Sequence, residues 1–187
     1  MNDTAEQQTK ALTAPHTARA LDERVRIGAL ELGTYECSCV ACQGMCHRRP
    51  CFGTPDDIER IVDAGHAGKL MAEYGTTDPE VLFGGPTVWM VQPAVVGFEG
   101  KVAPDDPGGT CAFLNRAGRC ELHDAGLKPS EGKIALCFEG HEELGIPFVS
   151  TPNILFEFTK LWNTERGLEV GRKWRKALDE GTQDETA

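Results

Sequence analysis

Residues 37–51 read CSCVACQGMCHRRPC, and they hold five of the eight cysteines in the chain. The other three, Cys111, Cys120 and Cys137, form a second group much later in the sequence. Short loops with such spacing are able to point several sulfur atoms at one centre. We therefore expect the two groups to converge in space and the rest of the fold to be built around them.

These cysteines are candidate metal ligands, because thiolates bind zinc, copper(I) and iron–sulfur clusters in preference to magnesium or calcium. A structural zinc and a four-iron cluster each take four ligands, so the number of cysteines leaves both open and allows one centre or two. We expect Cys37 to be idle. The predicted ligands are Cys39, Cys42, Cys46, Cys51, Cys111, Cys120 and Cys137.

Arginines accompany both groups: Arg48 and Arg49 lie in the first, and Arg119 directly precedes Cys120. A thiolate-bound cluster carries negative charge, which nearby cations and backbone amides offset. We therefore expect these three arginines to contact such a cofactor and tune its potential. No catalytic residue is predicted, because the chain has no phosphate-binding glycine loop, no G-x-S-x-G and no H-E-x-x-H.

The composition excludes several other classes of protein. The chain has 187 residues, 40% of them hydrophobic, and a formal net charge of −10, which is typical of one compact domain and disfavours nucleic-acid binding. The first thirty residues lack the apolar run of a secretory signal, and the longest uncharged stretch, 81–98, is broken by Gly and Pro. We expect a cytoplasmic protein without membrane contacts, in which cysteines serve metal or redox chemistry rather than disulfides.

The segment after the first cysteine group is predicted to be helical. Thr54 is a suitable N-cap, Pro55 suits the first helical position, and apolar residues then recur at helical spacing. We expect a break at Gly65 or Gly68, after which the helix resumes through residues 70–74. Residues 81–103 instead predict short strands, because they combine β-favouring residues with Gly and Pro.

The second cysteine group is predicted to begin in a β hairpin over residues 111–122, with its bend at residues 115–118. A Gly-, Pro- and Ser-rich loop is expected between Cys120 and Cys137. From Thr151 the spacing of Leu, Phe and Trp predicts one long helix or two shorter ones.

These elements together predict an α+β fold: a small helical domain with a short cysteine-lined β hairpin and long metal-binding loops. Residues 1–30 are polar and are expected to form a flexible or loosely docked N-terminal arm. Residues 31–150 are predicted to form the cysteine-cluster metal-binding domain. Residues 151–187 are predicted to be a C-terminal helical segment packed on the same domain.

Three separated pieces of the chain also match a known pattern in order: CVACQGMC at 39–46, TPDDI at 54–58 and CAFLNRAGRC at 111–120. They resemble the early cysteine block, the helix start and the second cysteine block of the bacterial YkgJ-like cysteine-cluster family. The domain of that family is described as zinc- or iron-chelating. Lys128-Pro129 followed by Cys137 is similar to its closing element.

The chain departs from that family at two places. Met45 stands where the family has a cysteine, and Cys51 is the candidate replacement for that ligand. The gap from Pro129 to Cys137 is longer than in the family. What the resemblance implies is metal chelation rather than a particular reaction.

The leading expectation is a metal-binding cysteine-cluster protein that holds an iron–sulfur cluster for electron transfer or cluster-assisted chemistry. An acidic or redox protein would be its partner. The alternative is a structural zinc-binding module that mediates a protein interaction. A third interpretation is a cytosolic thiol–disulfide oxidoreductase that uses the C-x-x-C pair Cys39 and Cys42.

Overall fold

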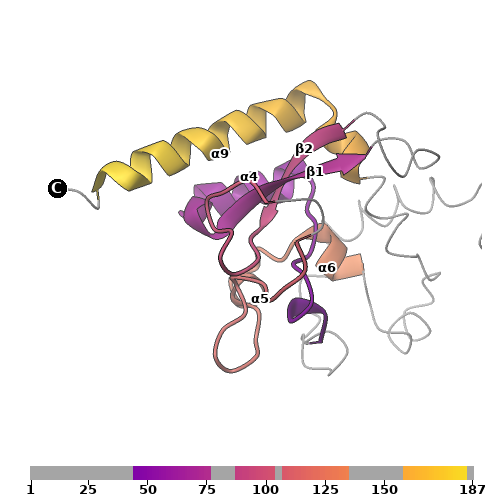
Figure 1. Ribbon diagram of the computed structural model, residues 1–187, viewed down its shortest axis with the longest axis vertical. Coiled ribbons are helices and arrows are strands. Elements are labelled where there is room, and N and C mark those ends of the chain that lie inside the picture. Colours follow the sequence, from indigo (N-terminus) through magenta and orange to yellow (C-terminus); the bar gives the residue numbers. More distant parts are fainter. Residues whose placement is uncertain (1–43, 77–86, 104–106, 135–157, 185–187) are drawn as a thin grey trace, which may run out of the picture.

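The computed structural model describes residues 44–76, 87–103, 107–134 and 158–184 (Figure 1). Within them, helices pack together with a two-stranded antiparallel sheet, in agreement with the α+β expectation at that level. The expected N-terminal arm, residues 1–30, lies outside the described residues, as do Cys37, Cys39, Cys42 and Cys137. No helix in the described part of the chain is long and apolar enough to span a bilayer.

Helix α4 (Pro55–Asp63) begins where the sequence predicts. The Thr54 hydroxyl accepts a hydrogen bond from the Asp57 amide at 3.2 Å, and the Asp57 carboxylate accepts one from the Thr54 amide at 3.0 Å. This reciprocal pair satisfies amides that a helix start otherwise leaves free. The apolar face of α4, which includes Ile58 and Ile61, is fully buried.

The expected resumption of the helix over residues 70–74 is wrong. The chain leaves α4 through Gly65, whose φ of 83° is left-handed, and passes through the short 3-10 helix η1 (Ala67–Lys69) into strand β1 (Leu70–Thr76). Strand β1 pairs with β2 (Thr87–Pro93), within the stretch predicted to be extended. Pairing with the next strand therefore overrides the local helical spacing.

The predicted hairpin at residues 111–122 is a chain reversal without a strand ladder. Its bend is where the sequence places it, because the Asn115 side chain accepts hydrogen bonds from the Ala117 and Arg119 amides. Only an isolated bridge between Leu114 and Cys120 joins its two arms within the described segment. Helix α5 (Glu121–Asp124) starts directly after Cys120 and ends the extended pairing.

The loop expected after Cys120 contains another short helix, α6 (Ser130–Ile134). At the C-terminal end, residues 158–162 are helical and α9 (Glu165–Asp184) follows, so of the two expected alternatives, one long helix or two shorter ones, the described residues form the second. Thr164 separates them: its hydroxyl donates to the Leu161 carbonyl at 2.7 Å and accepts from the Gly167 amide at 3.2 Å.

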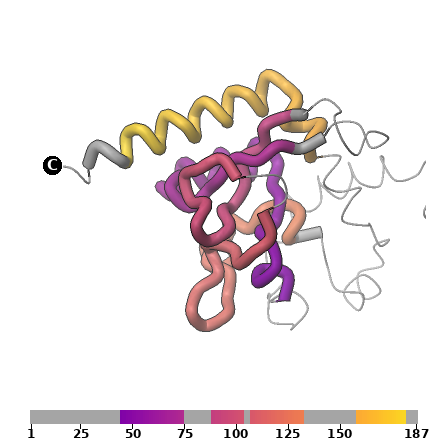
Figure 2. Tube along the Cα trace, in the orientation of Figure 1, coloured from indigo at the N-terminus to yellow at the C-terminus, as the bar shows by residue number. Residues whose placement is uncertain are grey.

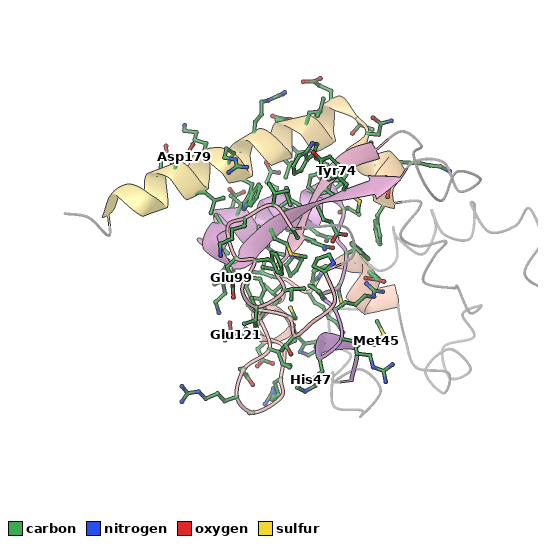
Figure 3. The ribbon with its side chains drawn as sticks, viewed as in Figure 1. Met45, His47, Tyr74, Glu99, Glu121 and Asp179 are labelled. Atoms are coloured by element: carbon green, nitrogen blue, oxygen red, sulfur yellow. The ribbon has the colours of Figure 1, made fainter. Side chains whose placement is uncertain are left out.

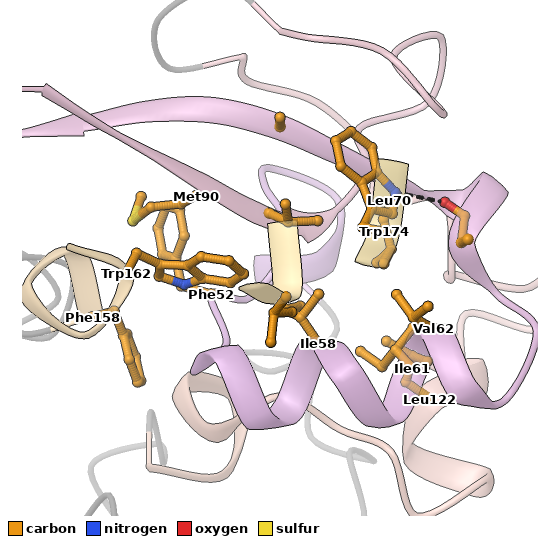
Figure 4. Close-up of a cluster of buried hydrophobic side chains, with 14 of the residues drawn as sticks. Phe52, Ile58, Ile61, Val62, Leu70, Met90, Leu122, Phe158, Trp162 and Trp174 are labelled. Carbon is orange, nitrogen blue, oxygen red and sulfur yellow. Dashed lines mark hydrogen bonds between the residues drawn. The ribbon is translucent and has the colours of Figure 1, made fainter. Parts of the chain in front are cut away.

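The main core lies between α4, the sheet and the C-terminal helices (Figure 4). Trp162 and Trp174 are almost fully buried there, and their indole N–H groups donate to the carbonyls of Gly53 and Ala67 at 2.9 and 3.0 Å. Helix α9 lies along one side of the molecule, and in this view residues 44–52 and 107–134 lie on the other (Figure 2). The described cysteines are all in these last two segments.

Candidate metal centre

Backbone hydrogen bonds join the two cysteine-bearing segments. The Cys111 amide donates to the Cys46 carbonyl at 2.8 Å, and the Gly109 amide donates to the Arg48 carbonyl at 2.7 Å. A bridge between Cys111 and Val95 ties the same point to the chain that follows β2. Within the described residues, the backbone at 46–48 therefore lies beside the backbone at 109–111.

The described thiols differ in burial. Cys111 is buried in the main core, where its neighbours include Phe113, while Cys46 and Cys120 pack against that core and are partly exposed. Cys51 is also partly exposed as a residue. Met45, His47 and Glu121 lie on the side of the molecule away from α9 (Figure 3).

The pKa values of Cys51 and Cys111 are raised, chiefly by burial. Burial raises the pKa of Cys51 well above its usual range, and the Glu131 carboxylate, Cys46 and Cys111 raise it further. Burial raises the pKa of Cys111 to about 12 against a hydrogen bond from the Phe113 backbone, and Cys120 and Cys46 add to the rise. Without a cation, Cys51 and Cys111 are therefore neutral thiols at pH 7, and a bound metal would have to displace their protons.

Cysteine thiolates are the ligands that zinc and iron–sulfur clusters use, and Cys46 and Cys111 come from segments whose backbones are hydrogen-bonded. However, no three His, Cys, Asp or Glu side chains among the described residues gather closely enough to hold a metal ion. Four predicted ligands are described, Cys46, Cys51, Cys111 and Cys120; the other three, Cys39, Cys42 and Cys137, lie outside the described residues.

The predicted cofactor-binding arginines have different surroundings. Burial lowers the Arg49 pKa, but the hydrogen bond and the charge of its partner Glu131 raise it above its usual value, and the negative form of the nearby Cys51 would add to that rise. Arg119 is largely exposed and pairs with Asp124 at 3.0 Å. Arg48 is exposed, and its carbonyl takes part in the junction with Gly109. Arg49 is thus the one of the three whose charge the structure couples to a cysteine.

Glu131 is a central residue that the sequence did not reveal. Its side chain is fully buried, and its carboxylate accepts hydrogen bonds from both terminal nitrogens of Arg49 and from the Phe52 amide, the last at 2.7 Å. The Glu131 amide in turn donates to the Phe52 carbonyl at 3.2 Å. Pro129 and Ser130 before it are a helix-start signal that could have indicated α6, but no local pattern indicates the partner across the fold.

Comparison of the chain with family models, curated proteins and solved structures finds no match.

Proposed function

We propose that this protein binds a metal centre through cysteine thiolates from two segments of its chain, and that the centre is an iron–sulfur cluster. The observation that carries the proposal is the hydrogen bond from the Cys111 amide to the Cys46 carbonyl, which joins the backbone at one cysteine of each group. The electrostatic coupling of Cys111 with Cys46 and Cys120 supports the same proximity. The resemblance to the YkgJ-like cysteine-cluster family points to the same chemistry.

The setting suits a cluster that exchanges electrons. When bound, an iron–sulfur cluster supplies one-electron chemistry, and burial and nearby hydrogen-bond donors tune its potential. This chain would contribute thiolates, exclude water at Cys111 and place the cation of Arg49 near Cys51. An acidic or redox protein in the cytoplasm, where thiols stay reduced, would be the partner.

A structural zinc site is the second candidate, and the burial of Cys111 in the main core favours it. A metal bound at a core residue adds its binding energy to the stability of the fold. The zinc module would then present a surface to another protein. The thiol–disulfide interpretation depends on Cys39 and Cys42, which lie outside the described residues.

Elemental analysis and visible absorption of protein purified without oxygen test the proposal. Brown protein that contains iron and acid-labile sulfide supports the cluster. Colourless protein with about one or two zinc atoms per chain favours the structural site instead, since closed thiolate sites hold zinc at that stoichiometry. Protein that holds neither metal and cannot be loaded with either would overturn both.

A further inference from the structure

One buried carboxylate holds the chain on both sides of Cys51. Glu131 accepts hydrogen bonds from the Arg49 side chain, two residues before Cys51, and from the Phe52 amide, directly after it. The Arg49 guanidinium also donates to the Pro50 carbonyl at 3.1 Å. Only Pro50 and Cys51 lie between Arg49 and Phe52, and the proline ring fixes the φ angle of Pro50.

The Cys51 sulfur packs closely against α6 at Gly132. A Cβ built on Gly132, the residue after Glu131, would lie 2.9 Å from the Cys51 sulfur and 2.7 Å from Cε of Lys128. The sulfur therefore occupies space that exists because residue 132 has no side chain. The same short helix, α6, thus both anchors the backbone around Cys51 and accommodates its sulfur atom.

We propose that Glu131 is a positioning residue for the candidate metal centre, which fixes the direction of the Cys51 thiol through Arg49 and Phe52. This inference rests on the function proposed above. A buried ion pair is commonly no more stabilising than apolar packing of the same volume. Orientation of the cysteine is a benefit that apolar packing would not supply, because hydrogen bonds have direction and dispersion contacts do not.

The test compares Glu131→Gln with the wild-type chain. Glutamine keeps the size of the side chain but removes the charge, and its amide nitrogen cannot accept a hydrogen bond. Either Nη2 of Arg49, or both Nη1 of Arg49 and the Phe52 amide, therefore lose their acceptor. We expect zinc affinity, measured by competition with a chromogenic chelator, to fall by roughly 10- to 100-fold, as is usual when a residue behind a metal ligand is changed. Reconstitution with ferrous iron and sulfide is measured in parallel.

A second readout separates positioning from general loss of stability. The metal-free chain is labelled with iodoacetamide, and the labelling of Cys51 is compared with that of Cys111 by mass spectrometry of peptides. We expect Glu131→Gln to raise the Cys51 to Cys111 labelling ratio several-fold. Trp174→Phe is the control, since it removes a buried hydrogen bond to Ala67 on the α9 side of the core and should leave the ratio and the zinc affinity unchanged.

Gly132→Ala tests the positioning of the Cys51 thiol and leaves the ion pair between Arg49 and Glu131 in place. It therefore keeps the proposal testable if Glu131→Gln does not fold. Alanine favours the helical conformation more than glycine does, so α6 itself gains from the change. The added Cβ would displace the Cys51 sulfur or the Lys128 side chain. We expect weaker zinc binding and a changed Cys51 labelling ratio in a chain that remains folded by circular dichroism.

The outcomes distinguish the two proposals. If the wild-type chain binds neither zinc nor iron, the proposed function fails, and the labelling ratio still decides whether Glu131 holds Cys51. If the wild type binds metal while Glu131→Gln and Gly132→Ala bind it equally well with unchanged labelling, the positioning role is overturned and the metal site stands. Equal effects of Glu131→Gln and Trp174→Phe on zinc affinity and on the labelling ratio would also overturn the positioning role. Such a result would mean that Glu131→Gln acts only by lowering the stability of the fold.

Discussion

At Gly109 the backbone passes so close to Val95 that no side chain fits between them. A Cβ there would lie 2.6 Å from Cγ1 of Val95, and the φ of Gly109 is 151°. The same residue donates its amide hydrogen to Arg48 where the two cysteine segments meet. A substitution at Gly109 would therefore disturb the hydrogen bond that joins the two cysteine-bearing segments.

We expect Gly109→Ala to lower the free energy of unfolding by about 1–3 kcal/mol, the usual cost of overpacking a site, and to weaken metal retention. Urea denaturation and elemental analysis measure the two effects. Gly118→Ala is the matched control: its φ is also positive, at 75°, but a Cβ there meets nothing within 4 Å. Unchanged metal retention in Gly109→Ala would show that the junction tolerates the displacement.

The N-cap of α4 gives a simpler prediction. Thr54→Ala removes the acceptor for the Asp57 amide, and we expect it to lower the free energy of unfolding by about 1 kcal/mol. Thr54→Ser keeps the hydroxyl and should retain most of that stability. Equal denaturation midpoints for the alanine and serine variants would contradict the assignment of the hydroxyl as the cap.

These residues also show what a sequence reveals at this scale. Thr54 was predictable because its hydrogen bond closes within three residues. Glu131 was not, because its partners Arg49 and Phe52 are about eighty positions away in the chain and nothing local marks the pairing. Local chemistry can be read from neighbouring residues, whereas a buried long-range ion pair requires the tertiary fold.

At the scale of elements, α4 and α9 are joined by a group of charged side chains. Arg166 of α9 pairs with Asp56 at 3.0 Å and with Glu59, and Lys173 pairs with Glu59 at 3.0 Å and with Asp63 at 2.6 Å. Each pair is partly solvated and weak by itself. Glu59 is the carboxylate that pairs with both cations, which makes it the residue to test.

Hydrogen bonds from Arg166 and then Lys173 lower the Glu59 pKa below its ordinary value of 4.5. A lowered carboxylate pKa contributes stability that is present above pH 4.5 and is lost as the pH falls through the folded-state value. We expect Glu59→Gln to be less stable than the wild type at pH 7, and the difference to shrink on acidification. Thermal denaturation across this pH range measures it; a difference independent of pH would contradict it.

The strand at residues 70–76 shows why elements are harder to predict than caps. Its apolar residues suit a helix as well as a strand, and the choice depends on pairing with β2, about twenty residues later. The bend at residues 115–118 was predictable, but the start of α5 after Cys120 prevents a strand ladder. In both cases the neighbouring element, not the segment itself, decides the structure.

At the scale of the whole molecule, the cysteine spacing predicted that two distant segments would meet, and the junction of Cys46 with Cys111 agrees. The spacing did not predict whether a proposed centre would be zinc or an iron–sulfur cluster, because both use the same ligands. The positions of Cys39, Cys42 and Cys137 fall outside the described residues, so their role as ligands stays a prediction.

That prediction is testable by substitution. We expect Cys42→Ser and Cys120→Ser each to abolish metal retention and to lower the melting temperature, because a four-ligand thiolate centre loses one ligand. Cys37→Ser, as the control, should change neither quantity. Elemental analysis and thermal melts measure them, and equal metal content in the wild type and in the Cys42 and Cys120 variants would refute the ligand assignment.

The placement of the three tryptophans has a practical consequence. Trp89 is 44% exposed, whereas Trp162 and Trp174 are 1% and 2% exposed. Iodide in solution should therefore quench the fluorescence of Trp89 and spare that of the other two. The Trp162 indole N–H donates a hydrogen bond to the carbonyl of Gly53, two positions after Cys51. Binding or loss of an iron–sulfur cluster near Cys51 should therefore also change the fluorescence intensity of Trp162.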